Sequence, residues 1–142
     1  ALSEPYFLDA NLCLLYLSIE HRGTIDKKFI PHFANQIYGC DVCQEACPYN
    51  FSTVDLVREK NVTLDGLSPL LTLTPYDVAT MHQGDYERWF GGTAMTRAKL
   101  TGLVRNALYH LHAVGDERLK DVLKKRANDE DESIRQVVSQ LT

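Results

Sequence analysis

The sequence lacks several features that mark common protein classes. No apolar run approaches the roughly 18 residues of a membrane span and no signal-peptide pattern is present, so we expect a cytoplasmic protein without a membrane partner. Basic residues are not in excess: 15 Lys and Arg stand against 19 Asp and Glu, for a net charge of −4. This balance argues against a uniformly basic nucleic-acid binder and allows a local basic patch. The remaining composition, 44% hydrophobic and 24% charged, is that of an ordinary globular domain.

Cysteine is scarce, and its spacing is informative. The sequence has four cysteines, with Cys13 on its own and the others in the block Cys40-x₂-Cys43-x₃-Cys47-Pro48. A small disulfide-stapled fold has a different composition, and a chain of 142 residues can bury a core without staples. The spacing therefore favours a metal or a cluster in a reducing compartment over two disulfides.

The cysteine block matches part of the bacterial ferredoxin motif C-x₂-C-x₂-C-x₃-C-P, whose fourth cysteine ligates the other cluster in two-cluster proteins. Cys40, Cys43 and Cys47 take the last three positions, and Cys13 is left to supply the first. If Cys47 serves a second cluster, its partners are expected before Ala1 in a longer protein. Zinc is the alternative, because four thiolates complete a tetrahedral site. The x₃ gap and the proline favour iron–sulfur.

Helical periodicity dominates the chain, and no segment alternates like a strand over more than four residues. The expected class is therefore mainly α. Helices are expected after Asp9 with Cys13 on the first turn, after Pro31, after Asp41 as a short turn, from Thr74-Pro75, and over about 85–90.

Three further helices are expected after Gly91-Gly92, and they carry a repeat. The pattern Val104-Arg105-x-Ala107-Leu108-x-x-Leu111 matches Ile134-Arg135-x-Val137-Val138-x-x-Leu141 at an offset of 30 residues. Helices joined by short turns at such an offset are typical of a HEAT-like α-solenoid. The predicted organisation is a ferredoxin-like iron–sulfur half-module over residues 1–61, a helical connector over 62–92 and HEAT-like helices over 93–142.

A basic face is expected on the HEAT-like helices. Arg97 and Arg105, placed on one helix from about Thr93, are a little over two turns apart and would project in similar directions. Lys120 and Lys124 would share one face of the next helix. These four residues predict one surface that takes the phosphates of an RNA stem. The alternative is an ordinary solvated helix face.

Three stretches of the sequence resemble the epoxyqueuosine reductases. They are Pro5-Tyr6-x-Leu8-Asp9-Ala10 leading to Cys13-x-x-Tyr16-Leu17-x-Ile19-Glu20-His21-x-Gly23, then Ile37-Tyr38-Gly39-Cys40-Asp41-x-Cys43-Gln44-x-x-Cys47-Pro48-x-Asn50, and later Phe90-x-Gly92-Thr93-Ala94 with Arg97 and Leu103-x-Arg105-Asn106. The resemblance covers nearly the whole chain. Its most specific part is the cysteine block together with Ile19-Glu20-His21.

The resemblance implies the C-terminal part of a cobalamin-dependent oxidoreductase with two [4Fe–4S] clusters, which reduces epoxyqueuosine to queuosine in the anticodon loop of tRNA. It implies that Cys13, Cys40 and Cys43 hold the cluster nearer the cobalamin and that Cys47 helps to hold the other. It further implies a monomer that takes electrons from an external donor. Because the family's cobalamin domain and first cysteine run are not among these residues, we expect the chain alone to be inactive.

Two other functions fit the residues. One is a zinc-stapled helical interaction module without a redox role. The other is the electron-relay part of another cobalamin enzyme, such as a reductive dehalogenase. A basic, HEAT-like region argues against the second alternative, because a small substrate needs no long basic face.

Overall fold

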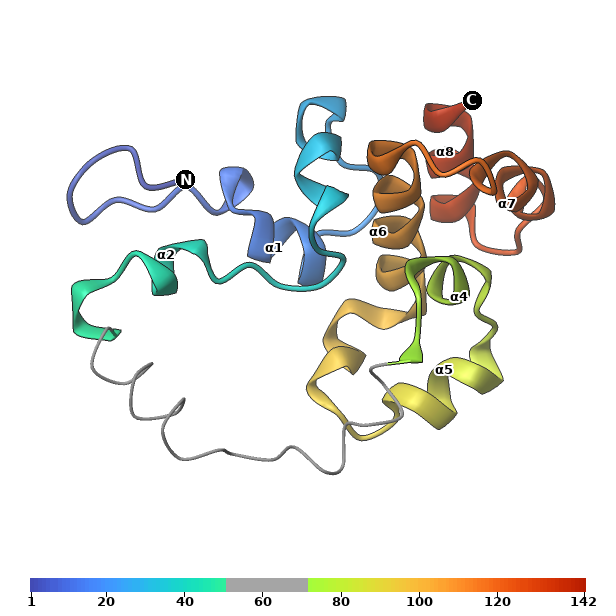
Figure 1. Cartoon of the computed structure of the whole chain (residues 1–142), viewed down its shortest axis with the longest axis horizontal. Coiled ribbons are helices and arrows are strands. Elements are labelled where there is room, and N and C mark those ends of the chain that lie inside the picture. The colour runs from blue at the N-terminus through green and yellow to red at the C-terminus, as the bar shows by residue number, and fades with distance from the viewer. Residues whose placement is uncertain (51–71) are drawn as a thin grey trace. The chain divides into compact units, whose positions relative to one another are not determined.

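The computed structural model describes residues 1–50 and 72–142. The chain divides into two compact units, one made of residues 1–39 and 74–142 and the other of residues 40–73. The described residues are mainly helical and contain no sheet, only an isolated bridge between Glu4 and Phe7 (Figure 1). The predicted mainly α class is therefore confirmed. The expected segment of residues 1–61 is divided between the two units.

The first unit begins with one α-helix between two 3₁₀ segments, which are η1 (Ala10–Leu12), α1 (Leu14–Ile19) and η2 (Lys27–Ala34). The Asp9 carboxylate caps η1 by accepting a hydrogen bond from the Asn11 N–H at 2.9 Å. Cys13 was expected on the first turn of the helix and is instead the N-cap residue of α1. The reason is that the chain completes a 3₁₀ turn before α1 begins.

The segment η2 also differs from the expected helix. It starts four residues before Pro31 and has 3₁₀ geometry. The Asp26 carboxylate accepts from the Lys28 N–H at 3.0 Å and so starts the segment early. The buried side chains Ile30 and Phe33 attach it to the core.

The described part of the second unit is short. The helix α2 (Val42–Glu45) follows Asp41, as predicted, and carries Cys43. The 3₁₀ turn η3 (Pro48–Asn50) follows Cys47. Residues 51–61 of the predicted iron–sulfur module and residues 62–71 of the predicted connector lie outside the described residues.

Thr74 and Pro75 open α4 (Pro75–Thr80), as their sequence predicts. The Thr74 hydroxyl oxygen accepts from the Asp77 N–H at 3.3 Å, and the Asp77 carboxylate accepts from the Thr74 N–H at 2.8 Å. This reciprocal pair is a capping box. The helix α5 (Gln83–Phe90) and the 3₁₀ segment η6 (Ala94–Ala98) follow, separated by Gly91-Gly92.

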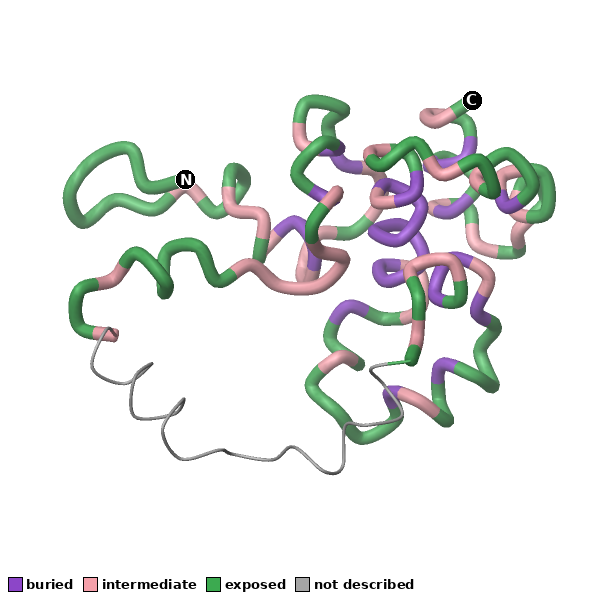
Figure 2. Tube along the Cα trace, in the orientation of Figure 1, coloured by how far each residue is buried: buried purple, intermediate pink, exposed green. Residues whose placement is uncertain are grey.

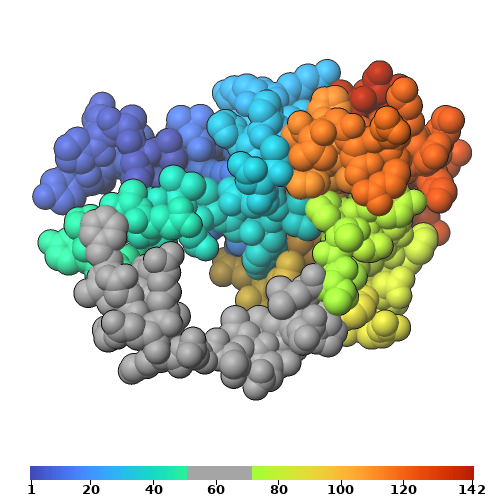
Figure 3. Space-filling model, viewed as in Figure 1, coloured from blue at the N-terminus to red at the C-terminus, as the bar shows by residue number. Residues whose placement is uncertain are grey.

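The helix α6 (Lys99–Val114) is the centre of the first unit's core. Its residues from Gly102 to Tyr109 are all buried, and Figure 2 shows this helix as a nearly continuous buried turn-by-turn stretch. The segments η2, α4 and α8 pack against it. In the space-filling view the surface runs without a gap from η2 to the end of α6 (Figure 3).

Two helices complete the first unit, α7 (Leu119–Arg126) and α8 (Glu132–Leu141). Gly115 ends α6 in the left-handed conformation, with φ of 70°, and Asp131 caps α8 by accepting from the Ser133 N–H at 2.8 Å. Both boundaries agree with the sequence prediction. Among the helices of residues 1–50 and 72–142, none combines the length and apolar character needed to cross a membrane.

Candidate metal centre and basic surface

Three of the four cysteines lie on the turn that begins the second unit. The Cys47 N–H donates to the Gln44 carbonyl at 3.2 Å, and the Asn50 side-chain amide donates to the same carbonyl at 2.9 Å and to the Gln44 side-chain oxygen at 3.0 Å. These bonds close the turn between Cys43 and Cys47. Cys43 is exposed, while Cys40 and Cys47 are partly buried.

The fourth cysteine belongs to the first unit. Cys13 is partly buried, and its thiol makes no cap hydrogen bond at the start of α1. Its backbone is held on both sides, because its N–H donates to the Ala10 carbonyl at 3.0 Å and its carbonyl accepts from the Leu17 N–H at 2.9 Å. The α1 helix therefore fixes the backbone from which this thiol projects.

All four cysteines are free thiols. A set of soft sulfur donors fits an iron–sulfur cluster, and it also fits zinc. Neither unit, over the residues that the structure describes, gathers three or more His, Cys, Asp or Glu side chains as a metal site. Metal binding and local folding are coupled, because thiolates repel one another until a metal joins them. The donor set therefore fits a cluster that organises its own ligands on binding.

The four predicted phosphate-binding residues do not share one environment. Lys120 and Lys124 are exposed on α7, four residues apart, as predicted. Arg97 is also exposed, but its guanidinium pairs with the Glu20 carboxylate. Arg105 is only 3% exposed, so the prediction that it lies on a phosphate-binding surface is wrong.

The spacing argument for Arg97 and Arg105 fails for a geometric reason. It placed both residues on one helix, whereas Arg97 lies on η6 and Arg105 on α6. Between the two segments Lys99 adopts a φ of 59°, which breaks the helical register. The two side chains therefore do not follow a common helical face.

Arg105 instead forms a buried polar pair with Asn106. The Arg105 Nε donates to the Asn106 side-chain oxygen at 3.0 Å, and the remaining donors of both side chains reach backbone carbonyls. The sequence pattern named these two residues as part of a resemblance but gave no sign of their burial. An arginine within an apolar helical stripe was the available signal.

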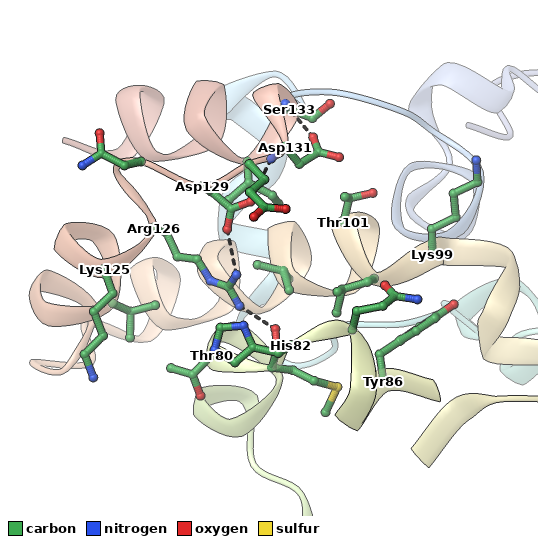
Figure 4. A pocket seen from close by; sticks show the side chains of 18 of the residues that line it. Thr80, His82, Tyr86, Lys99, Thr101, Lys125, Arg126, Asp129, Asp131 and Ser133 are labelled. Carbon is green, nitrogen blue, oxygen red and sulfur yellow. Dashed lines mark hydrogen bonds and ion pairs between the residues drawn. The ribbon is translucent and has the colours of Figure 1, made fainter. Parts of the chain in front are cut away.

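Arg126 is a second basic residue with an internal role. Its side chain is 12% exposed and donates to the Ala79 carbonyl at 3.1 Å and the Met81 carbonyl at 2.6 Å. It also pairs with the Asp129 carboxylate at 2.7 Å, as Figure 4 shows. The basic run at the end of α7 is thus divided between exposed lysines and one arginine that joins α7 to the end of α4.

A hollow of about 1260 Å³ in the first unit surrounds Arg126 (Figure 4). Its border includes residues of both charges, among them Lys99, Lys125, Asp131 and Glu130. Small-molecule pockets are usually lined mainly by apolar and aromatic side chains. This mixed border does not resemble such a pocket.

Comparison with known proteins assigns the first part of the chain. Residues 1–50 match the family described as "4Fe-4S double cluster binding domain". The epoxyqueuosine reductase of Gloeobacter violaceus is 36% identical over 118 residues, which are 82% of this chain and 37% of the relative. That of Shigella dysenteriae is 32% identical over 134 residues, which are 91% of this chain and 34% of the relative. The chain thus spans about a third of the length of the curated relatives that it matches.

Solved structures agree on the fold. A crystal structure described as epoxyqueuosine reductase with an epoxyqueuosine-modified tRNA-Tyr stem loop superposes with a TM-score of 0.74 at 21% identity, over 94% of this chain and 35% of that one. The enzyme from Bacillus subtilis gives the same TM-score at 20% identity. Sequence and fold together show that this chain is a homologue of the epoxyqueuosine reductases and carries a 4Fe-4S double cluster binding domain.

Proposed function

We propose that the chain is the iron–sulfur and tRNA-binding portion of an oxidoreductase that reduces epoxyqueuosine to queuosine in tRNA. The observation that carries this proposal is the match of residues 1–50 to a 4Fe-4S double cluster domain that contains all four free cysteines. The zinc reading shares the same donor set and is tested directly below. The relatives that the chain matches are epoxyqueuosine reductases, which supports this activity over that of a reductive dehalogenase.

In this proposal Cys13, Cys40 and Cys43 contribute to one [4Fe–4S] cluster, and Cys47 contributes to a second. The clusters, when bound, supply one-electron transfer from an external donor. The chain's own residues hold the ligands in place. The turn closed by Asn50 and Gln44 fixes the backbone around Cys47, and α1 fixes the backbone at Cys13.

Cobalamin, which the resemblance implies, does not fit the residues described here. The hollow around Arg126 is bordered by charged groups of both signs, and the Arg126–Asp129 ion pair lies within it. A corrin ring needs a broad apolar contact surface, which this border does not offer. We therefore derive no step of the reaction through cobalamin in this part of the protein.

For tRNA, the exposed basic residues are the proposed contacts. Lys120 and Lys124 on α7 face solvent together, and Arg97 is exposed at the end of η6. Lysines on a HEAT-like helix would hold phosphates without reading bases. The solved relative bound to a tRNA stem loop supports this assignment. Arg105 is not part of the proposed surface, because it is buried.

A chimera tests the proposed activity. Residues 1–50 of this chain replace the cysteine-bearing stretch of the Escherichia coli relative, which is 50% identical over 50 residues. In cells that lack their own reductase, we expect this chimera to restore queuosine in tRNA. The same chimera with Cys43→Ser is expected to fail, whereas Val42→Ala, which changes an exposed neighbour on α2, is expected to succeed. Restoration by the Cys43→Ser chimera would contradict the role of this cysteine.

A further inference from the structure

Four side chains of α6 hold the backbone of the segment that connects Cys13 to Cys40 in sequence. Arg105 and Asn106 bind both ends of that segment, while Tyr109 and His110 bind its middle. All of these contacts lie within the first unit. A single helix of the α-helical core thus fixes the path of the chain between two proposed cluster ligands.

Arg105 binds the end of α1 and the turn after it. Its Nη2 donates to the Leu17 carbonyl at 2.7 Å, and its Nη1 donates to the His21 carbonyl at 2.8 Å and the Gly23 carbonyl at 3.0 Å. Carbonyls at the end of a helix have no partner within the helix. The planar guanidinium offers several donors in a fixed geometry and suits such a group of acceptors.

The Arg105 guanidinium is a buried charge without a carboxylate partner. None of the ion pairs found within residues 1–50 and 72–142 includes it. Burial lowers the pKa of Arg105 to about 10, so the side chain stays protonated at neutral pH. A buried charge is costly unless it is compensated, and the negative end of the α1 dipole together with three carbonyls compensates it here.

Asn106 binds the other end of the segment. Its side-chain amide donates to the Ser18 carbonyl at 2.7 Å and to the Ile37 carbonyl at 2.8 Å. The Ser18 hydroxyl oxygen in turn accepts from the Gly39 N–H at 3.1 Å. Gly39 directly precedes Cys40 in the chain, and Asn106 and Ser18 are both fully buried.

Two consecutive residues of α6 are therefore linked to both cysteines, each through one residue of α1. Arg105 binds the Leu17 carbonyl, and the Leu17 N–H binds the Cys13 carbonyl. Asn106 binds the Ser18 carbonyl, and the Ser18 side chain binds the residue before Cys40. We infer that Arg105 and Asn106 are positioning residues that set how Cys13 and Cys40 are presented to an iron–sulfur cluster. This inference rests on the proposed function, in which these cysteines are cluster ligands.

Tyr109 provides a matched control on the same helix. Its side chain is also fully buried, and its hydroxyl accepts from the Ile25 N–H at 3.0 Å and donates to Gln140 at 2.6 Å. Ile25 lies in the middle of the segment, well separated in sequence from Cys13 and Cys40. Loss of this hydroxyl weakens the core without touching the links to either cysteine.

The experiment compares Asn106→Leu, Ser18→Ala and Arg105→Lys with Tyr109→Phe in the 142-residue chain. Each variant is reconstituted anaerobically with iron and sulfide and measured for thermal midpoint, for cluster loss to a chelator and for the electron paramagnetic resonance spectrum of the reduced cluster. In the chain without iron, the alkylation rates of Cys13 and Cys40 are followed by mass spectrometry. Ser18→Ala removes one acceptor only and guards against a variant that fails to fold.

At equal loss of thermal midpoint, we expect the three test variants to release iron on the order of tenfold faster than Tyr109→Phe, with a shifted spectrum. We also expect faster alkylation of Cys13 or Cys40 in these variants alone. Spectra, iron release and alkylation that match those of Tyr109→Phe would overturn the inference. If the unsubstituted chain takes up no iron while alkylation still separates the variants, the proposed cluster fails and the positioning of the thiols stands.

Discussion

Arg97 and Arg105 lie eight residues apart, yet one is exposed and the other is buried. Arg97 makes a surface ion pair with Glu20, an interaction that solvent screening keeps weak. Arg105 gives its guanidinium to three backbone carbonyls and to Asn106. Both are arginines on helical segments, and only the packing around them separates a phosphate contact from a structural tie.

Replacing each arginine by methionine measures this difference. Arg105→Met leaves buried carbonyls without a donor, so we expect it to lower the free energy of unfolding by about 3 kcal/mol or more. Arg97→Met removes an exposed ion pair and is expected to change it by no more than about 1 kcal/mol. Urea unfolding followed by circular dichroism gives both values. Equal losses in the two variants would show that the Arg105 contacts do not stabilise the fold.

The exposed lysines of α7 are tested by their effect on tRNA binding. We expect the double variant Lys120→Ala and Lys124→Ala to weaken binding of a tRNA stem loop and to lower the salt dependence of the affinity by about two charges. The matched control is Lys27→Ala with Lys28→Ala, which removes two exposed lysines from η2. An equal effect of both pairs would assign the binding to general electrostatic attraction and exclude a site on α7.

The short helices show which elements the sequence can predict. Local signals identify α4 and α8, because Thr74-Pro75 and Asp131 cap them with their own side chains. The boundary at Cys13 was displaced because η1 takes up a turn that periodicity assigns to α1. The path of the chain through η2 follows from contacts with α6 that are distant in sequence, and no local pattern encodes them.

The capping box of α4 predicts a pH-dependent contribution to stability. Hydrogen bonds from Thr74 hold the pKa of Asp77 below its ordinary value of 3.8 in the folded chain. The carboxylate therefore stabilises the fold at pH values above 3.8, and this contribution is lost as the pH falls through the lowered pKa. We expect Asp77→Asn to cost about 1 kcal/mol at neutral pH, a typical capping value. Thermal midpoints across the acid range should converge for the two proteins, and a constant gap would contradict this account.

The candidate site could be predicted from sequence only in part. The four cysteines follow directly from their spacing, because C-x₂-C-x₃-C-P is a dense local motif. The roles of Arg105, Asn106 and Ser18 depend on α6 lying against α1, a contact between residues more than 80 positions apart. For the same reason, an arginine in a basic sequence run was mistaken for a surface residue. Lys120 and Lys124 lie on one helix, where spacing alone predicts a common face.

Taken as a whole, the chain supplies one part of a larger enzyme's chemistry. It spans about a third of the relatives that it matches, and the residues described here do not fit a corrin. We therefore expect the 142-residue chain, given cobalamin, a reductant and epoxyqueuosine-containing tRNA, to produce no queuosine. Nucleoside analysis by mass spectrometry measures this, with the full-length Escherichia coli relative as the positive control. Turnover by the chain alone would contradict this account.

The most direct test of the central claim is Mössbauer spectroscopy of the 142-residue chain after anaerobic reconstitution with isotope-enriched iron and sulfide in the presence of competing zinc. The account predicts the signature of a [4Fe–4S] cluster, with iron and sulfide in equal amounts, and its loss in Cys13→Ser and Cys43→Ser. A colourless chain that binds one zinc ion through all four cysteines and takes up no iron would contradict it.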